Sequence, residues 1–594
     1  MKSRHVQQVP VLLAFHPRSI PHWLRAACAV VLLCAATAIA SPAATKFKSL
    51  VSFNVTDGLN PDLMSVAQGL DGNLYGTTVY GGANKTCNAK QVGCGTVFKI
   101  TPGGTLTTLY SFCSNTNCTD GAYPIGGMTL ATNGDLYGTT SGGGANGYGM
   151  VFKVSPQGKL TTVYNFCSQF GCPDGREPGA PPIQGTDGNL YGTTILGGTG
   201  GCGGCHGGGV AYKLTLGGKQ SVIHNFCTGT CTDGNNPSYP LVQGTDGNFY
   251  GVITGRAGYY DGKLFKMTPK GTLTVLYNFC AQSNCTDGAF PYGALTQGAD
   301  GDLYGTTSAG GAVGDGGNGT FYKITKAGKL TTLHSFDYET KGNYGSDPQA
   351  GVVLGTDGNF YGGTYLGGTL CVFGCGTVFK ITPKGTLTTL YLFGSTDGAG
   401  PYGLFQHTGG AFYGATAAGG DNKQNYGTVF SVSVGLGPFV ALLPDDSKVG
   451  KTIDILGQGL TGTTAVSFNG TAATFTVVSD TYLTAVVPPN TIRGSVTVTT
   501  PGGQRTSNTI FRVAPVIISF SPPSGPVGQQ VAISGTSFTG ATKVTFGGVK
   551  ATVFSVDNDG QITATVPTGA VTGKIQVTTS DGTATSSTDF TVTQ

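Results

Sequence analysis

Short runs in which apolar and polar residues alternate recur along residues 46–435, separated by turns rich in glycine, aspartate and proline. Within the stretch 351–393, four such runs follow one another: 352–354, 360–364, 377–382 and 386–393. Period-two runs of β-branched and aromatic residues, bounded by turn residues, are typical of β-strands. The pattern therefore predicts four short antiparallel strands in this stretch.

The same arrangement recurs seven times, and each copy carries Asp-Gly-Asn-Leu-Tyr-Gly-Thr-Thr or a close variant of it. One tyrosine marks each copy, at steps of 62, 54, 59, 54, 57 and 52 residues: Tyr75, Tyr137, Tyr191, Tyr250, Tyr304, Tyr361 and Tyr413. Such a period indicates supersecondary units that bury a core against their neighbours. Four-stranded antiparallel units repeated radially form the blades of a β-propeller.

The two ends of the repeat region predict how it closes. The seventh copy ends after its third strand, at residues 428–432, and the run at 46–53 resembles the fourth strand of another copy, at 329–336. A ring closed by pairing of its two ends explains this permutation, because closure removes exposed sheet edges. We therefore predict an all-β protein with a seven-bladed β-propeller over residues 46–435.

The predicted meander also sorts the loops. Tight Asp-Gly-Asn and Pro-Lys-Gly turns share one face, and the long loops after the second and fourth strands share the other. Binding sites usually lie on loops that a rigid scaffold positions. We therefore expect a ligand on the long-loop face.

The period changes after Gly437. Four residues recur 78 positions later: Gly450, Gly457, Phe468 and Gly470 return as Gly528, Gly535, Phe546 and Gly548. Duplicated units with short alternating strands predict two immunoglobulin-like β-sandwiches, at residues 437–513 and 514–592.

Composition supports a folded, turn-rich protein. Among 594 residues there are 101 glycines, with 39% hydrophobic and only 10% charged residues, whereas disordered chains combine low hydrophobicity with high charge. The net charge of +4 is small for this length and no basic stripe appears. We therefore expect no nucleic-acid partner.

Residues 1–40 have the character of a secretory signal peptide. Basic residues precede the apolar run 26–40, which ends in Ala38-Ile39-Ala40 before Ser41. The run is short for a bilayer span, so we predict cleavage and no membrane insertion of the mature chain, with an uncleaved anchor as the alternative. The mature protein is then expected outside the cell or at its surface, with the periplasm as a further alternative.

Fourteen of the 16 cysteines follow the predicted signal peptide, and all fourteen fall into close pairs. An even set in an exported chain indicates disulfides, each closing a short loop. The predicted pairs are Cys87/Cys94, Cys113/Cys118, Cys167/Cys172, Cys202/Cys205, Cys227/Cys231, Cys280/Cys285 and Cys371/Cys375.

Two resemblances cover nearly all of residues 46–592. The repeats, with Asp-Gly-Asn-Leu-Tyr-Gly-Thr-Thr at 71–78 and Gly-Thr-Val-Phe-Lys-Ile-Thr-Pro at 95–102, resemble the Gloeobacter/Verrucomicrobia-type tandem repeat of exported bacterial proteins. The second C-terminal unit, at 515–538, resembles the IPT/TIG family, and the first is a weaker match. The repeat family implies export, but it implies no known reaction.

An acidic residue recurs between the copies, on the predicted long-loop face: Asp57, Asp120, Asp174, Asp233, Asp287, Asp347 and Asp397. Seven carboxylates could gather Ca²⁺ through hard oxygen ligands. Aspartate before glycine is more often a turn residue that bonds its own backbone. Both interpretations stay open, and we predict no cofactor.

Aromatic residues beside proline lie near these aspartates: Tyr123, Tyr239, Phe290, Tyr292 and Tyr402. An aromatic platform with polar neighbours suits stacking on a sugar or contact with a peptide. Packing between blades is the alternative.

Catalytic signatures are missing from the sequence. Cys202-Gly203-Gly204-Cys205-His206 matches the covalent haem-attachment pattern, but related loops pair cysteines without a following histidine, which favours a disulfide. There is no Gly-Xaa-Ser-Xaa-Gly elbow and no Walker loop. We therefore predict a binding or adhesion protein for an extracellular glycan or protein. The alternatives are an extracellular hydrolase or lyase on a propeller scaffold and a structural surface component.

Overall fold

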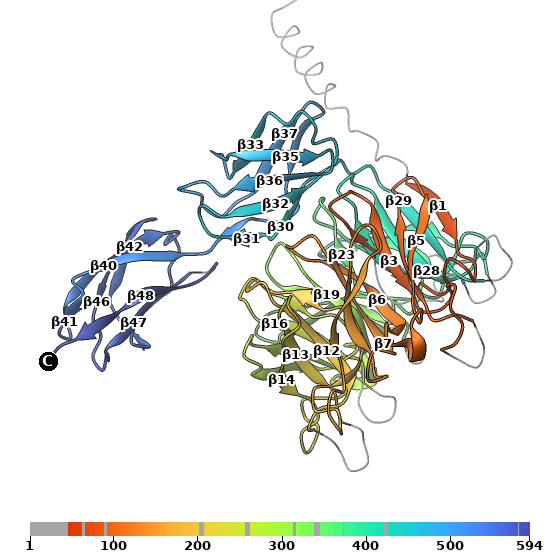
Figure 1. Ribbon diagram of the computed structural model, residues 1–594, viewed down its shortest axis with the longest axis horizontal. Helices are drawn as coiled ribbons and strands as arrows, with labels where there is room; N and C mark the ends of the chain where they lie inside the picture. Colours follow the sequence, from red (N-terminus) through yellow and green to blue (C-terminus); the bar gives the residue numbers. More distant parts are fainter. Residues whose placement is uncertain are drawn as a thin grey trace, which may run out of the picture. The chain divides into compact units, whose positions relative to one another are not determined.

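Figure 1 shows the protein as a computed structural model. The structure describes residues 45–594 except 62–65, 88–91, 201–206, 256–261, 313–316, 338–344, 372–373, 421–424 and 580. The predicted signal peptide and the Cys202/Cys205 pair therefore lie outside the described residues.

Seven antiparallel sheets follow one another along the repeat region, within the described residues. The first three are β2 (Ala67–Gln68), β3 (Leu74–Thr78), β4 (Thr96–Ile100) and β5 (Leu106–Ser111); β6 (Ala122–Leu130), β7 (Leu136–Gly142), β8 (Met150–Val154) and β9 (Leu160–Asn165); and β10 (Arg176–Pro178), β11 (Ile183–Gln184), β12 (Leu190–Leu196), β13 (Val210–Leu214) and β14 (Gln220–Asn225). The fourth and fifth are β15 (Val242–Gln243), β16 (Phe249–Ile253), β17 (Lys263–Met267) and β18 (Leu273–Asn278); and β19 (Ala289–Gln297), β20 (Leu303–Ala309), β21 (Thr320–Ile324) and β22 (Leu330–Ser335). The sixth is β23 (Val353–Leu354), β24 (Phe360–Thr364), β25 (Thr377–Ile381) and β26 (Leu387–Leu392).

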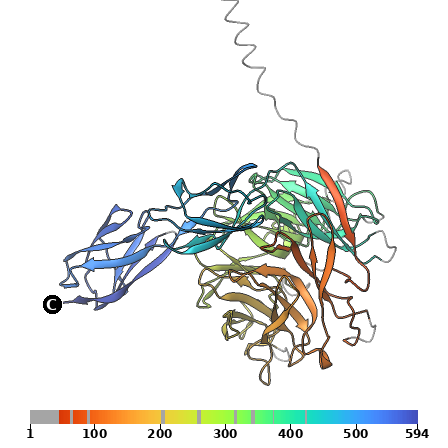
Figure 2. The ribbon, with the colours of Figure 1, turned by 45° about the horizontal axis from the view of Figure 1, so that its top comes forward.

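The seventh sheet combines the two ends of the repeat region. It orders β1 (Lys46–Ser52), β29 (Thr428–Ser433), β28 (Phe412–Ala418) and β27 (Ala399–Gln406). β1 pairs antiparallel with β29, with Phe47 opposite Val432, and Figures 1 and 2 both show the red first strand beside the teal β29. The first strand of the repeat region therefore supplies the fourth strand of the last sheet, as predicted.

The third sheet has five strands where four were predicted. Its first run is divided into β10 and β11, with Pro181 and Pro182 between them. Proline has no N–H group to donate to a neighbouring strand, so two consecutive prolines interrupt the pairing with β12.

Buried hydrophobic clusters lie between successive sheets rather than within one. Phe112 of the first sheet packs with Phe152 of the second at 5.1 Å between ring centroids, and comparable clusters join each later neighbouring pair. A further cluster contains Val429 of the seventh sheet together with Leu74 and Phe98 of the first. Each fully buried side chain of this kind contributes about 1.5–3 kcal/mol.

A glutamine–threonine pair repeats the same sheet-to-sheet contact. The Gln184 side chain of the third sheet accepts a hydrogen bond from Thr132 N of the second (2.8 Å) and donates one to Thr132 Oγ1 (3.1 Å). Gln68 of the first sheet accepts from Thr408 N of the seventh (3.0 Å) and donates to Thr408 Oγ1 (2.8 Å). The same glutamine–threonine pair of hydrogen bonds therefore joins sheets that are neighbours along the chain and also joins the last sheet to the first.

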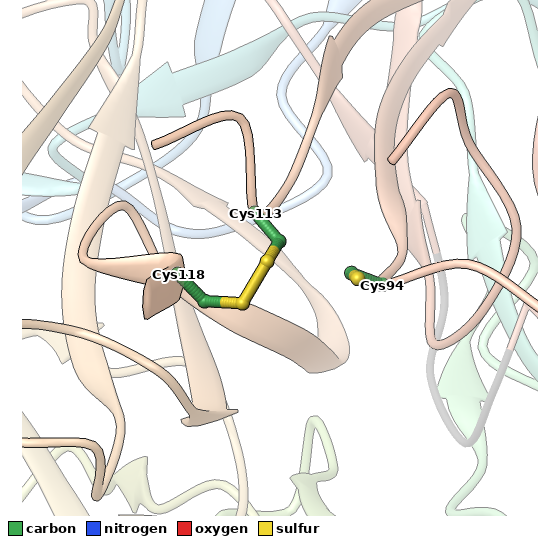
Figure 3. Close-up of side chains that lie close together, drawn as sticks. All are labelled: Cys94, Cys113 and Cys118. Carbon is green, nitrogen blue, oxygen red and sulfur yellow. A yellow bond between two sulfur atoms is a disulfide. The ribbon is translucent and has the colours of Figure 1, made fainter. Parts of the chain in front are cut away.

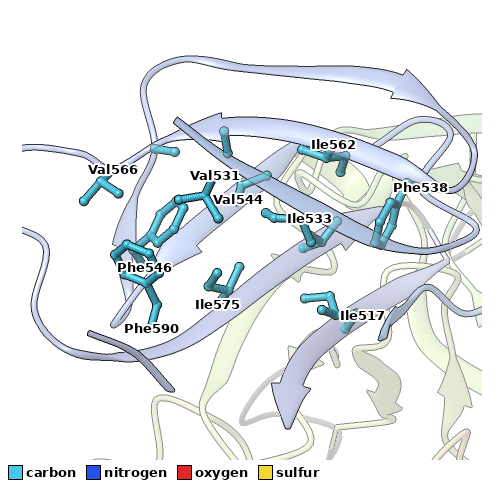
Figure 4. Close-up of a cluster of buried hydrophobic side chains, with 14 residues drawn as sticks. Ile517, Val531, Ile533, Phe538, Val544, Phe546, Ile562, Val566, Ile575 and Phe590 are labelled. Atoms are coloured by element: carbon cyan, nitrogen blue, oxygen red, sulfur yellow. The ribbon is translucent and has the colours of Figure 1, made fainter. Parts of the chain in front are cut away.

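Two sandwiches follow the repeat region. The first has sheets of β30 (Ala441–Leu443), β32 (Thr452–Leu456), β36 (Tyr482–Val486) and β35 (Phe475–Ser479), and of β34 (Thr471–Ala472), β33 (Ala465–Phe468), β37 (Val496–Thr500) and β38 (Gly503–Thr506), with β31 (Asp446–Ser447) pairing β39 (Arg512–Val513). The second has sheets of β40 (Val516–Ser521), β42 (Gln530–Thr536), β46 (Gln561–Thr565) and β45 (Phe554–Asn558), and of β41 (Ser524–Gly525), β48 (Gly582–Val592), β47 (Gly573–Thr579), β43 (Lys543–Phe546) and β44 (Val549–Lys550). Val531, Ile533 and Phe546 fill its core (Figure 4).

The prediction of an all-β protein with two immunoglobulin-like sandwiches is confirmed. The only helical segments among the described residues are two short 3₁₀ turns, Thr116–Cys118 and Ser283–Cys285. Within the same residues, no helical segment has the length and apolar character needed to cross a bilayer.

Candidate functional site

Seven residues of the repeat region share a left-handed backbone conformation, and each stands directly before a buried proline. Their φ angles lie between 53° and 63°: Asn60, Tyr123, Glu177, Asn236, Phe290, Asp347 and Gly400. We call them the pre-proline set. They follow the long loops that connect one sheet to the next. A left-handed conformation is uncommon for residues other than glycine and persists where the surroundings impose it.

Contacts to the preceding sheet impose this conformation. Tyr123 N donates to the Cys94 carbonyl of the first sheet at 2.9 Å. Pro124 covers Gly95, where a Cβ would lie 2.4 Å from Pro124 Cδ and could not fit. The chain is therefore fastened to its neighbour on both sides of the Tyr123–Pro124 peptide bond.

The same contact joins the last sheet to the first. Asn60 N donates to the Tyr426 carbonyl at 3.0 Å, and a Cβ on Gly427 would lie 2.9 Å from Pro61 Cδ. Asn60 belongs to the loop that enters the first sheet, and Tyr426 precedes β29 of the seventh.

The backbone of the pre-proline set is constant, but its side chains are not. Six of the seven positions carry a half-buried side chain: two amides, two aromatic rings and two carboxylates, with glycine at Gly400. Loops vary more in sequence than the strands they connect, and they also carry many of the binding residues of proteins.

Most of the predicted aspartates organise their own loops. Asp120 is only 4% exposed and accepts hydrogen bonds from Tyr110 Oη (2.7 Å), Ser114 N (2.9 Å) and Asn115 N (3.1 Å). Burial acts to raise the pKa of Asp120, but these donors outweigh it and hold the pKa below its ordinary value.

The same pattern recurs in the neighbouring loops. Asp174, Asp287 and Asp397 each accept from a fourth-strand tyrosine and from backbone N–H groups of their own loop. Asp233 pairs instead with His224 Nε2 at 2.9 Å, so the histidine occupies the tyrosine position. Asp57 accepts from Asn54.

Asp347 has a different place. It belongs to the pre-proline set, three residues further along the repeat than Asp120 when the two loops are aligned on their prolines. Within the described part of the chain, its carboxylate accepts one side-chain hydrogen bond, from Gln349 Nε2 at 2.7 Å. Burial raises the pKa of Asp347, and the Gln349 bond opposes that shift.

A tyrosine of the fifth sheet belongs to the strand that packs against this segment. Tyr292 lies in β19, and the next residue, Gly293, is so close to Gly351 that a Cβ on it would lie 1.9 Å from Gly351 N. Burial raises the pKa of Tyr292, and the negative charge of Asp347 raises it further. Tyr292 packs on the buried Tyr239 with ring centroids 5.4 Å apart. We call Asp347, Gln349, Tyr292 and Tyr239 the Asp347 cluster.

The remaining predicted aromatics divide into two kinds. Tyr402 is buried beside Tyr365, with ring centroids 6.0 Å apart. Tyr123 is half-buried beside Tyr80, at 5.8 Å between centroids, and its hydroxyl donates to the Cys87 carbonyl at 2.8 Å. Phe290 is half-buried in the pre-proline set.

Six of the seven predicted disulfides are present among the described residues, and each stiffens one of the long loops. They are Cys87–Cys94, Cys113–Cys118 (Figure 3), Cys167–Cys172, Cys227–Cys231, Cys280–Cys285 and Cys371–Cys375. The predicted disulfide framework is therefore confirmed in this part of the chain.

Three overlapping stretches, residues 38–205, 167–346 and 314–464, match the Gloeobacter/Verrucomicrobia repeat. The chain belongs to the Gloeobacter/Verrucomicrobia repeat family. Residues 439–513 and 515–592 each match the IPT/TIG domain. Both predicted resemblances are thus confirmed. No curated protein matches the chain.

Solved structures show only distant likeness to this family member. A fungal alcohol oxidase in complex with copper is 13% identical, with 79% of this chain and 98% of that chain covered and a TM-score of 0.43. An aldose sugar dehydrogenase from Streptomyces coelicolor is 13% identical over 66% and 99% of the two chains, at 0.34. A surface glycan-binding protein from Prevotella bryantii is 19% identical over 26% and 38%, at 0.19. At such TM-scores these likenesses assign neither fold nor function.

Sequence reasoning missed Asn60, Glu177, Asn236 and Gln349. A signal for the first three was present, because the residue before the repeated proline varies while the proline itself does not. Gln349 gave no signal, since it contributes only by its contact with Asp347.

Proposed function

We propose that residues 46–435 form a seven-bladed β-propeller closed by its own first strand. The pairing of β1 with β29, the Gln68–Thr408 contact and the packing of Pro61 on Gly427 support closure. The pairing completes the seventh sheet with a fourth strand, and the other two repeat, between the last and first sheets, contacts found between neighbouring sheets.

Removal of residues 46–53 tests closure. We expect the β29 amide hydrogens that bond β1 to exchange with solvent much faster in the truncated chain, because they lose their partner while the pairing of β29 with β28 remains. Amides of the central strand β17 should keep their protection and serve as the control. Unchanged exchange in β29 would refute closure.

We propose that this propeller binds an extracellular carbohydrate through the pre-proline set on its long-loop face. The observation that carries the proposal is the Asp347 cluster, in which the Asp347 carboxylate accepts from the Gln349 amide at 2.7 Å and the half-buried Tyr292 lies on the strand that packs against the same segment. Aromatic faces stack on the apolar faces of sugar rings, while carboxylates and amides accept and donate hydrogen bonds to hydroxyl groups.

The disulfides and the half-buried aromatics support this assignment. Cross-linked loops lose less conformational entropy when a ligand binds, and short disulfide-closed loops are typical of proteins in oxidising compartments. We accordingly propose that the chain is exported, and that the loop-bonded aspartates stabilise loops rather than hold Ca²⁺.

A polysaccharide binding panel with the full chain tests the function. For a carbohydrate that binds, Tyr292→Ala should weaken binding roughly tenfold, equivalent to about 1.4 kcal/mol. Tyr482→Ala is the matched control, because Tyr482 is also a half-buried tyrosine beside a carboxylate, Asp454, but belongs to the first sandwich and not to the repeat region. Equal affinity of Tyr292→Ala and the wild type for that carbohydrate would refute the proposal. A chain that binds a protein and no carbohydrate would also refute the proposed ligand class.

A further inference from the structure

One histidine lies where the last sheet of the repeat region meets the first. His407 follows β27 and is only 3% exposed. Its Nε2 lies 3.0 Å from the carbonyl oxygen of Gly72, in the turn between β2 and β3, and its Nδ1 accepts a hydrogen bond from Gly409 N at 3.0 Å. The next residue, Thr408, is the one that Gln68 of the first sheet bonds. We call the contact of His407 and Thr408 with the first sheet the seam.

The partners of the ring fix its protonation state. The Gly72 carbonyl can only accept, so Nε2 carries a hydrogen, and the Gly409 N–H group can only donate, so Nδ1 carries none. His407 is therefore neutral when the seam is closed. A second proton can bind only at Nδ1, where it meets the Gly409 N–H group and breaks that hydrogen bond. A buried donor then lacks an acceptor, and the ring carries a buried charge, both of which are costly.

Histidine at this position is particular to the last copy. Six residues before the marker tyrosine, the other six copies carry glycine or alanine: Gly69, Ala131, Gly185, Gly244, Gly298 and Gly355. The second sheet offers a direct comparison, because Thr132 makes the same pair of bonds to Gln184 as Thr408 makes to Gln68. Thr132 follows an alanine, so its contact is a matched control without a titrating ring.

The other titratable groups on the elements around His407 are engaged elsewhere, within the described part of the chain. The Asp71 carboxylate accepts from donors of its own turn, and the Tyr413 hydroxyl donates to a backbone carbonyl of the first sheet at 3.3 Å. On the side of the first sandwich, Gln458 donates to the Oγ1 of Thr408 at 3.2 Å and is uncharged. Asp480 accepts from two N–H groups of that sandwich. The protonation of His407 is thus set by its own buried contacts.

We propose that protonation of His407 opens the seam, so that the last and first sheets separate at this point in acid. This inference rests on the proposed closure of the ring. The proton binds Nδ1, the Gly409 bond is lost, and the turn 407–410 no longer holds Thr408 against Gln68. Burial lowers the pKa of His407 below its ordinary value of 6.5, and the bond to Gly72 opposes that shift. The stability that the neutral ring gives is therefore present above pH 6.5 and is lost as the pH falls through the folded-state pKa.

Hydrogen exchange of the full chain at pH 7 and pH 5 tests the seam, with protection expressed relative to an unstructured chain at the same pH. Amides of residues 408–410 report on the seam, and the Thr132 amide is the control. Between pH 6.5 and the lower folded-state pKa, each pH unit weakens the seam about tenfold. Protection at 408–410 should therefore fall about tenfold at pH 5, while Thr132 keeps its protection.

Two variants separate His407 from other effects of acid. His407→Gln keeps a donor and an acceptor but does not titrate, so residues 408–410 should stay protected at pH 5. His334→Gln replaces a half-buried histidine of the fifth sheet and should respond to acid as the wild type does.

The outcomes distinguish the seam from closure itself. Equal protection of residues 408–410 at both pH values in the wild type would overturn the inference and leave closure standing. Absent protection at pH 7 would overturn closure as well. An equal fall at Thr132, or in folded His407→Gln, would show a general effect of acid and would also overturn the inference. The wild-type comparison of residues 408–410 with Thr132 decides the matter even if His407→Gln does not fold.

Discussion

The loops that enter the second and sixth sheets carry the same residue type but use it differently. Asp120 is nearly fully buried and is bonded by Tyr110 and by backbone N–H groups of its own loop. Asp347 lies three residues further along, in the pre-proline set, and accepts one side-chain bond from Gln349. Among the described residues, the first carboxylate is bonded several times within its own loop, whereas the second accepts a single side-chain bond.

The role of an aspartate in these loops therefore depends on its position relative to the repeated proline, and not on the fact that an aspartate recurs in each loop. Donors around Asp120 lower its pKa although burial opposes them, and around Asp347 burial prevails and raises it. Two environments thus shift the same group in opposite directions, which makes the comparison testable.

The largest expected effect is on stability. Asp120→Ala should lower the free energy of unfolding of the repeat region by about 3 kcal/mol, because several buried donors lose a charged acceptor. Asp347→Ala is the matched control and should change it by less than about 1 kcal/mol. Denaturant unfolding monitored by tyrosine fluorescence measures both. Equal losses would remove the distinction between the two loops.

Removal of a single donor sharpens the comparison. Tyr110→Phe deletes the 2.7 Å bond to Asp120 but keeps the ring, so we expect a loss of about 1.5 kcal/mol. Tyr292→Phe beside Asp347 should be neutral within about 0.5 kcal/mol. The same unfolding assay applies, and a neutral Tyr110→Phe would show that the bond does not stabilise the loop.

Acid should affect the two sites in opposite directions. The lowered pKa of Asp120 gives stability that is present above its ordinary value of 3.8 and is lost as the pH falls through its folded-state pKa. The raised pKa of Asp347 gives stability that is present below 3.8 and is lost as the pH rises through its folded-state pKa.

Asp120→Asn should therefore destabilise at pH 7 and approach the wild type in acid. Asp347→Asn should equal or exceed the wild type at pH 7, by up to about 1 kcal/mol, and lose that advantage in acid. Melting curves between pH 3 and pH 7 measure both differences, as an order-of-magnitude test. Parallel curves would contradict the opposite pKa shifts.

The smallest expected effect concerns Gln349. Gln349→Leu removes the amide that donates to Asp347, and we expect stability within about 0.5 kcal/mol of the wild type. Carbohydrate binding should weaken roughly threefold, because the carboxylate loses the group that orients it. Titration calorimetry measures the change, and Gln184→Leu in a sheet-to-sheet contact is the control. If Gln349→Leu lowered stability but left binding intact, Gln349 would have a structural role and no role in binding.

Much of the scaffold could be predicted because its signals are local. The stretch 360–364 was expected as a strand and is β24, since Phe360 and Tyr361 follow the Asp-Gly-Asn turn at 357–359 and the same order recurs in the other copies. The split of β10 from β11 also had a local cause in Pro181 and Pro182.

The site was less predictable because its chemistry depends on register and contact. Asp347 was grouped with Asp120 by spacing alone, although the sixth repeat carries Tyr344-Gly345 where the second carries Asp120-Gly121. The left-handed conformation of Tyr123 arises from contacts with Cys94 and Gly95 of another sheet. The residue type of Tyr123 does not predict that conformation.

Ligand affinity and melting temperature measured together for Asp347→Asn and Asp120→Asn test the central claim most directly. We predict that Asp347→Asn melts with the wild type and binds carbohydrate roughly tenfold more weakly, equivalent to about 1.4 kcal/mol. Asp120→Asn should melt earlier and, while folded, bind as the wild type does. Intact binding by Asp347→Asn with lost binding by folded Asp120→Asn would contradict the account.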